Sequence, residues 1–219
     1  HFNIATLFLF DRLSLFFLCV IALIALPSAV YSVGYLKGGY SRFKTALAWF
    51  LFACFLISMG LVGSVRNVLA FLVAWEVMSL VSYFFVVFDT THEKSIQSGT
   101  IYMVMTHIGT AFLIAAFMLM YPYAKSFDFL TLKNACVNIP IQTKNIIFLL
   151  LLTGFGTKAG IVPLHIWLPY AHPQAPSHIS SIMSGVMIKT AIYGIIRFVM
   201  FTLGVTSAWW GVLVLVLAV

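Results

Sequence analysis

The stretch GFGTKAGIVPLHIWLPYAHPQAPSHISSIMSGVMIKTAIY, from Gly154 to Tyr193, decides the fold of this chain. It contains two lysines, three histidines and four prolines within a sequence that is otherwise apolar. An ionisable group inside a membrane span is costly, and it therefore indicates a functional site. Proline and glycine in such a span predict a broken helix, which is tolerated where protein or a water-filled cavity satisfies the freed backbone groups.

The composition of the whole chain predicts a membrane protein. Of its 219 residues, 63% are hydrophobic and only 8% are charged. Soluble domains contain about 25% charged residues, so this chain could not cover a water-facing surface. The net charge of +7 does not indicate nucleic-acid binding, because the basic residues stand singly in loops or spans. We therefore expect contact with the lipid bilayer and no nucleic-acid partner.

Apolar segments of about 20 residues, the length that crosses the hydrocarbon core, recur along the chain. They predict an all-α, polytopic transmembrane bundle, forming a single membrane domain over residues 1–219 with a broken fifth span. A further apolar segment starts at Ala208 and stops at residue 219, so we expect a fragment of a larger membrane protein. The six full spans are expected at Leu13–Leu36, Ala46–Val65, Val68–Phe88, Thr100–Met120, Ile146–Leu168 and Ser177–Phe201.

The connections carry weaker signals. Three basic residues in the loop Lys37–Thr45 favour the cytoplasmic side for that loop under the positive-inside rule. The longest connection, Tyr121–Lys144, contains FDFLTL, which predicts a short interfacial helix. Pro27 predicts a kink in the first span.

Three ionisable side chains are expected deep within spans. Counted from the start of its span, Glu76 lies about 12 Å deep, and Lys158 and Lys189 each lie about 18 Å deep. One interpretation is a structural ion pair between Glu76 and Lys158, although such pairs rarely stabilise more than apolar residues would. The other is a proton path, because a buried lysine whose charge depends on a nearby carboxylate can bind and release a proton. Ser79, on the helical face of Glu76, could orient its carboxylate.

The fifth span has its predicted break next to Lys158. Pro163 removes a backbone donor, and its ring would clash with the carbonyl of Ala159. Gly160 loosens the same turn. The end of a broken helix carries partial charge that can act on a nearby ion or ionisable group. An ordinary proline kink remains the alternative interpretation.

Four histidines are further candidates for a proton path. His165, His172 and His178 follow the predicted break, and an imidazole can relay protons near neutral pH. His172 and His178 could equally be interfacial polar residues. His107 is expected to line a polar interior, with a packing histidine bonded to a backbone carbonyl as its alternative.

The sequence indicates no cofactor site. Cys19, Cys54 and Cys136 lack ligand spacing, so neither a metal cluster nor a disulfide framework is predicted. The chain also contains no nucleotide-binding loop and no flavin motif. We therefore expect no redox chemistry in this chain itself.

Two long motifs resemble a known family. FLVAWEVMSLVSYF (Phe71–Phe84) and KAGIVPLHIWLPYAHPQAPSHISSIMSGVMIKTAIYGIIR (Lys158–Arg197) are similar to the antiporter-like membrane subunits of respiratory complex I and its relatives. Within that family, DRLSLFF and MVMTHIGTAF (Met103–Phe112) look most similar to the large membrane subunit of group 4 [NiFe] hydrogenases.

The resemblance implies a fold of about fourteen helices that contains two inverted repeats, of which this chain is a part. By position, Glu76 resembles the family's helix-five glutamate, Lys158 the lysine of its broken helix seven, and Lys189 the lysine of helix eight. Met183 stands where some relatives have a histidine. The charged residue of the family's helix twelve would lie beyond Val219.

The resemblance also implies a function. We expect a proton-translocating or sodium-translocating subunit of a hydrogenase-type complex in the cell inner (cytoplasmic) membrane, with other membrane and peripheral subunits as partners. The alternatives are a subunit of an NADH-quinone oxidoreductase or of a multi-subunit cation/proton antiporter. An alternative of another class is a membrane anchor or scaffold that translocates nothing.

Overall fold

The computed structural model describes residues 7–37, 40–89 and 93–218. In this part of the chain the regular structure is helical, and the two β-bridges are isolated. The α-helices are α1 (Arg12–Lys37), α2 (Arg42–Ser64), α3 (Val68–Val86), α4 (Glu93–Ala124), α5 (Phe129–Ala135), α6 (Ile141–Ala159), α7 (Leu168–Gln174), α8 (Ser177–Ile182), α9 (Ile188–Gly194) and α10 (Ala208–Ala218). Two 3₁₀ turns, η2 (Cys136–Asn138) and η3 (Leu164–Trp167), and two π-helical stretches, η4 (Met183–Met187) and η5 (Ile195–Leu203), join them.

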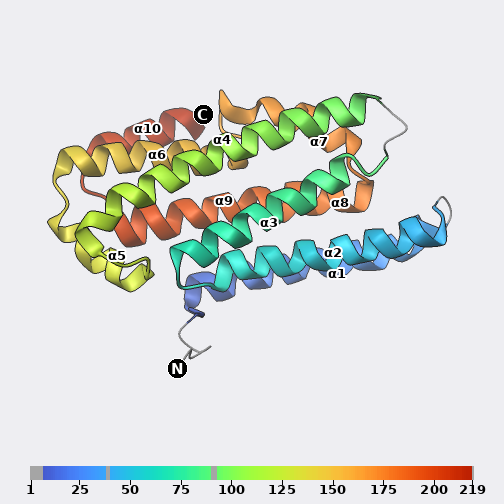
Figure 1. The fold of residues 1–219 in the computed structure, drawn as a ribbon, viewed down its shortest axis with the longest axis horizontal. Coiled ribbons are helices and arrows are strands. Elements are labelled where there is room, and N and C mark those ends of the chain that lie inside the picture. The colour runs from blue at the N-terminus through green and yellow to red at the C-terminus, as the bar shows by residue number, and fades with distance from the viewer. Residues whose placement is uncertain (1–6, 38–39, 90–92, 219) are drawn as a thin grey trace.

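The predicted all-α polytopic bundle is confirmed. Within the described residues, six helical segments are long and apolar enough to cross a membrane: Arg12–Lys37, Arg42–Ser64, Val68–Val86, Lys94–Ala124, Ile141–Gln174 and Ser177–Leu203. They run side by side along the long axis, with α1 and α2 at one edge and α4 and α6 at the other, where the shorter helix α10 also lies (Figure 1).

Some helices are longer than their apolar segments predict. The fourth helix begins at Glu93 rather than at Thr100 and continues to Ala124. A helix can extend beyond the hydrocarbon core because polar side chains are satisfied in the headgroup region. α1 continues through Pro27 as one helix, and the helix predicted from FDFLTL is α5.

The turns between spans are closed by polar side chains. The side chains of Ser41, Asn67 and Asp128 accept hydrogen bonds from backbone N–H groups at the starts of α2, α3 and α5. Arg66 Nε also donates to Asp128 Oδ2 at 2.5 Å, which ties the α2–α3 turn to α5. Burial raises the pKa of Asp128, but the hydrogen bond from Arg66 and the capped N–H groups hold it below its ordinary value.

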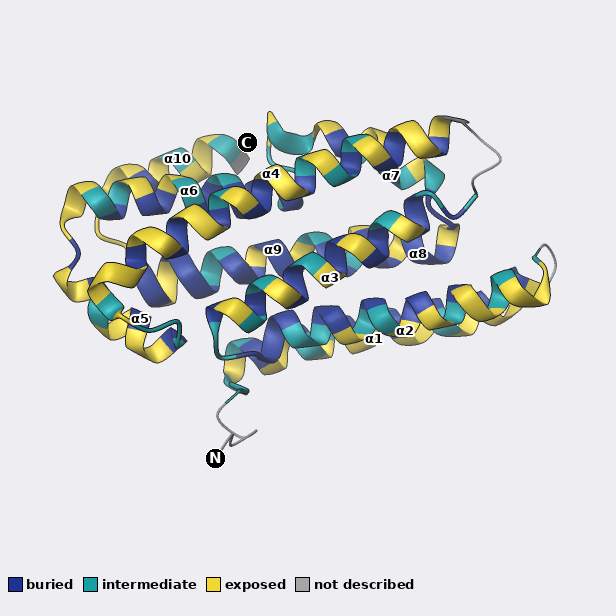
Figure 2. Cartoon of the chain, viewed as in Figure 1, coloured by how far each residue is buried: buried dark blue, intermediate teal, exposed yellow. Residues whose placement is uncertain are grey.

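The core is a cluster of aromatic rings centred on Phe71 of α3. Its ring meets those of Phe117, Phe129, Phe155 and Phe198 edge to face, with centroids 5.0 Å to 6.4 Å apart. Such T-shaped contacts add to the apolar area that each ring buries. Buried residues line the inner faces of the helices and exposed ones the outer faces (Figure 2), although most of the exposed large residues are apolar. A soluble protein would show polar residues there, so the outer faces suit lipid.

Two glycines let α4 and α6 approach closely. A Cβ placed at Gly154 would lie 2.6 Å from Leu113 Cδ2 and 2.8 Å from the carbonyl oxygen of Gly109. A Cβ at Gly109 would in turn lie 3.1 Å from the carbonyl oxygen of Gly154. Small residues at membrane helix interfaces allow this backbone contact.

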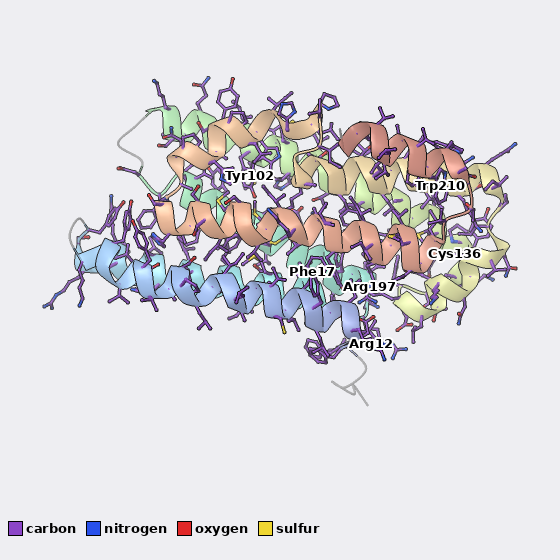
Figure 3. The ribbon with its side chains drawn as sticks, turned by 180° about the vertical axis from the view of Figure 1, so that it is seen from behind. Arg12, Phe17, Tyr102, Cys136, Arg197 and Trp210 are labelled. Carbon is purple, nitrogen blue, oxygen red and sulfur yellow. The ribbon has the colours of Figure 1, made fainter. Side chains whose placement is uncertain are left out.

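A buried arginine, Arg197, clamps η5 against the start of α1. Arg197 Nη1 and Nη2 donate to the two carboxylate oxygens of Asp11 at 2.5 Å and 2.8 Å. Nη2 also donates to Ser14, and Nε donates to Tyr193, whose hydroxyl donates to the carbonyl of Gly63. The clamp thus joins η5 to the start of α1 and the end of α2 (Figure 3). The hydrogen bonds from Arg197 lower the pKa of Asp11 to about 2.

We predict that Gly154→Ala destabilises the fold. The new methyl group would overlap α4, and overpacking of this kind typically costs about 1–3 kcal/mol. Gly34→Ala in α1 is the matched control, because a Cβ there meets nothing within 4 Å. In a helix, alanine is favoured over glycine, so the control should be neutral or stabilising. Thermal unfolding in detergent measures both, and equal melting temperatures would contradict the close packing.

We also predict an acid-sensitive clamp. The folded pKa of Asp11, about 2, lies below its ordinary value of 3.8, so the stability it contributes is complete above 3.8 and falls as the pH drops towards 2. Asp11→Asn should lower the melting temperature at neutral pH. The same variant should also reduce the pH dependence of the melting temperature between pH 3.8 and pH 2. The dependence that remains is the contribution of Asp128. An unchanged pH profile would contradict this role.

Candidate functional site

Lys158 lies at the centre of the bundle, in the last turn of α6. Its side chain is 2% exposed, and Nζ donates to Ser79 Oγ at 2.5 Å. The ammonium also lies over the ring of Trp75, 4.7 Å from the ring centroid, a cation–π contact. A cation in the last turn of a helix is stabilised by the negative end of the helix dipole. These contacts let a lysine stay in the interior of the bundle.

The helix break lies directly after Lys158, where the sequence predicts it. α6 ends at Ala159, and Gly160 adopts a left-handed conformation with φ of 73°. This conformation favours glycine, and a Cβ there would also collide with Leu168. Pro163 precedes η3, and the chain then resumes as α7. Trp167 Nε1 donates to the carbonyl of Thr157 at 2.7 Å, so one carbonyl freed at the helix end is satisfied within the protein.

Glu76 belongs to a second polar group, on the α3–α4 face. Its Oε1 accepts a hydrogen bond from Thr110, and its Oε2 lies 3.4 Å from His107 Nε2. These side chains line an open groove of about 380 Å³. His107 Nδ1 is 2.9 Å from the carbonyl of Met103, which can only accept, so Nδ1 carries a proton. Nε2 can therefore donate to the Glu76 carboxylate only when the imidazole is doubly protonated.

Glu76 and Lys158 form no ion pair within 4.0 Å. Lys158 instead contacts Trp75 and Ser79, which lie four residues apart on one face of α3. Ser79, expected to orient Glu76, is buried; it accepts from Lys158 and donates to the carbonyl of Trp75 at 3.0 Å. The direct ion pair considered above is therefore absent. Glu76 is on α3 and faces α4, whereas Lys158 of α6 packs against Trp75 and Ser79 of α3.

Lys189 points away from the interior. It is exposed, and its Nζ donates to the carbonyl of Ser184 in the π-helical stretch η4 at 2.6 Å. It lies twelve residues after Ser177, about 18 Å into the sixth span. A charge at that depth faces a bundle interior or a water-filled cavity rather than lipid. We therefore expect this face of α9 to be covered by protein that the chain does not contain.

The three histidines after the break are partly or fully buried. His178 is 2% exposed and packs against Tyr35, with ring centroids 5.1 Å apart and the ring planes tilted by 56°. His172 Nδ1 lies 3.3 Å from Ser180 Oγ. One ring nitrogen of each histidine has no hydrogen-bond partner: His165 Nδ1, His172 Nε2 and His178 Nδ1. A buried polar atom without a protein partner is a common place for an ordered water.

Two parts of this arrangement were not predicted from the sequence. Thr110, which donates a hydrogen bond to Glu76, was not predicted because it is uncharged. The signal that could have identified it is its position three residues after His107, on the same face of the helix. No signal in the sequence pairs Arg197 with its partner Asp11, which lies 186 residues away. Within the described residues, no group of three or more His, Cys, Asp or Glu side chains could hold a metal ion.

Comparison with known proteins identifies the sequence family. Residues 65–219 match the family described as NADH:quinone oxidoreductase/Mrp antiporter, TM. Residues 1–44 match the family described as NADH-Ubiquinone oxidoreductase (complex I), chain 5 N-terminus. The family predicted from the two long motifs is therefore confirmed.

Individual relatives are similar over most of this chain. Hydrogenase-4 component B of Escherichia coli (strain K12) is 38% identical over 94% of this chain and 30% of its own length. NADH-ubiquinone oxidoreductase chain 4 of Paramecium tetraurelia is 31% identical over 84% of this chain and 37% of its own length. The chain thus spans about a third of the length of these two relatives.

A solved structure supports the fold. A chain in the structure of the Mrp complex from Dietzia sp. DQ12-45-1b superposes with a TM-score of 0.77 at 24% identity. The match covers 90% of this chain and 36% of that one. The antiporter-like arrangement of helices is therefore shared.

We predict that Ser79→Ala destabilises the protein through Lys158. The variant removes the acceptor of a buried ammonium, which typically costs about 1–3 kcal/mol. Adding Lys158→Met should restore stability, because the ion that needs the acceptor is gone. Ser58→Ala is the control, since Ser58 is equally buried and bonds only the carbonyl of Phe55 in its own helix. The measurement is the melting temperature in detergent. Equal losses in Ser79→Ala and Ser58→Ala would contradict the contact between Ser79 and Lys158.

Proposed function

Since the chain belongs to the NADH:quinone oxidoreductase/Mrp antiporter family of membrane proteins, we propose that it forms part of an ion-translocating subunit of a complex I-like membrane assembly. The ion is a proton or a sodium ion. The chain contributes the path, whereas the redox reaction that drives translocation takes place in other subunits.

Lys158 is the observation that carries this proposal. A buried ammonium with a serine and an aromatic ring as its neighbours is an expensive feature that a membrane anchor would not need. The helix ends beside Lys158, and Trp167 of the segment after the break bonds the carbonyl of Thr157. A movement of that segment can therefore shift Lys158 relative to its partners on α3. A lysine in this position can therefore hold a proton in one arrangement and release it in another.

Glu76 supplies the second station of the proposed path. Its carboxylate bonds Thr110 and faces His107 in a groove at the surface of the bundle. In the proposed path, water held in this groove brings protons to Glu76 through His107. Ser79 lies three residues further along α3 and bonds Lys158. In an interior of low dielectric constant, a charge on Glu76 acts on Lys158 without direct contact. Loading one site thus changes the proton affinity of the other.

The remaining ionisable groups of the proposed path would lie after the helix break in the sequence. His165, His172 and His178 have ring nitrogens free to bond water, which a proton relay requires. Lys189 would pass the proton to a part of the protein outside this chain, because it is exposed on the outer face of the sixth span. Gly160 and Pro163 form the break that separates Lys158 from this segment.

A hydrogenase-type assembly is the form that we favour. Hydrogenase-4 component B is 38% identical to this chain, compared with 31% for an NADH-ubiquinone oxidoreductase chain 4. The partners would then be the other membrane and peripheral subunits of a group 4 hydrogenase-type complex, in a cell inner (cytoplasmic) membrane.

We predict that Glu76→Gln and Lys158→Met each abolish ion translocation by the complete complex. Both changes keep the size of the side chain and remove its charge. The redox reaction, measured with artificial electron carriers, should continue at close to its normal rate. Vesicles that contain the complex and a pH-sensitive dye measure translocation.

Lys133→Met is the matched control, because Lys133 is an exposed lysine on α5, outside the proposed path. It should translocate normally. Normal translocation by both Glu76→Gln and Lys158→Met would favour a scaffold and refute the proposal. If neither wild-type nor variant complexes move ions while the redox reaction is intact, the proposal is also wrong.

A further inference from the structure

A long apolar groove lies between α2 and α3, away from the charged sites. It has a volume of about 650 Å³ and is lined mainly by apolar and aromatic side chains. Phe50 and Phe84 are 64% and 44% exposed along its walls, so the groove is open to the outside of the bundle. Its wall on α2 extends from Phe43 to Leu51, which is about 12 Å along the helix. The groove therefore runs from a helix end into the hydrocarbon region.

One end of the groove is basic. Lys44, which is half-buried in the first turn of α2, is the charged residue among those that line the groove. Arg42 begins the same helix, and Lys37 ends α1 on the other side of the short connection. An acidic residue, Asp89 after α3, is present at this end too, but it is not among the described residues that line the groove.

We propose that this groove binds one anionic phospholipid. An acyl chain would lie along Leu47, Phe50 and Phe84, and the phosphate would lie beside Lys44 and Arg42. Basic residues at the end of membrane helices attract anionic headgroups, and basic pockets between helices hold them selectively. The groove combines both elements in one place, because Lys44 lines it together with apolar side chains.

A second groove on the same helices supports the role of the charge. It has a volume of about 460 Å³ and is lined by residues that include Ile57 of α2 and Val73 of α3. Among the residues that the structure describes, no charged side chain lines it. Lipid tails can fill this second groove as well, but it offers nothing that would select a headgroup. Variants in the two grooves can therefore distinguish recognition of a lipid headgroup from filling of a groove by lipid tails.

The test is native mass spectrometry of the complete complex, reconstituted in nanodiscs that contain equal amounts of phosphatidylglycerol and phosphatidylcholine. Wild-type protein should retain phosphatidylglycerol in preference to phosphatidylcholine. Lys44→Gln should weaken that preference about fivefold, the change expected for one basic residue beside an anionic lipid. Lys133→Gln, at the opposite end of the bundle, should not. Leu47→Trp should displace the lipid by filling the groove, whereas Ile57→Trp in the second groove should leave the preference intact.

The proposal would be overturned if phosphatidylglycerol were not preferred, or if Lys44→Gln and Lys133→Gln behaved alike. It would also be overturned if Leu47→Cys formed a cross-link with another subunit in the intact complex, because a protein helix would then occupy the groove. Retention of lipid in Leu47→Trp as in the wild type would place the lipid elsewhere. None of these readouts requires ion translocation, so the result is independent of the function proposed above.

Discussion

The rest of the structure depends on keeping a lysine ammonium inside a bundle that is surrounded by lipid. Moving an ion out of water costs several kcal/mol even after the protein relaxes, so Lys158 must be stabilised by its surroundings. The structure provides the carbonyl end of a helix, a serine oxygen and the face of an indole ring. None of these carries a full charge, so the stabilisation depends on their positions. A displacement of α6 relative to α3 would change the environment of Lys158.

The segment after the break is linked to this lysine through the backbone. Trp167 donates to the carbonyl of Thr157, the residue before Lys158, and it also stacks near the ring of His172. A movement of η3 or α7 would therefore reach the last turn of α6 directly. On the other side, α3 carries Ser79 towards Lys158 and Glu76 towards α4. The helix α3 thus separates the acid from the base while remaining in contact with both sites.

The positions of the spans could be predicted from the sequence, because hydrophobic length alone determines where a chain can cross a membrane. The break could also be predicted, since Gly160 and Pro163 act through the local backbone. The partner of Lys158 could not, because the spacing along α3 does not determine how that helix is rotated towards α6. The contact between Asp11 and Arg197 is set by the tertiary fold, and nothing local predicts a pair so distant in sequence.

The exposed position of Lys189 has a consequence for how the protein is made. The sixth span has a mean hydropathy of 1.7, the lowest of the six. A lysine at the centre of a span opposes insertion by about 3 kcal/mol on the scale measured for the translocon. When α9 leaves the translocon, its charged face must therefore be sheltered by helices that have already been inserted or by those that follow. The order in which the helices are synthesised thus affects assembly, because the sixth span is stable in the membrane only when its neighbouring helices are also inserted.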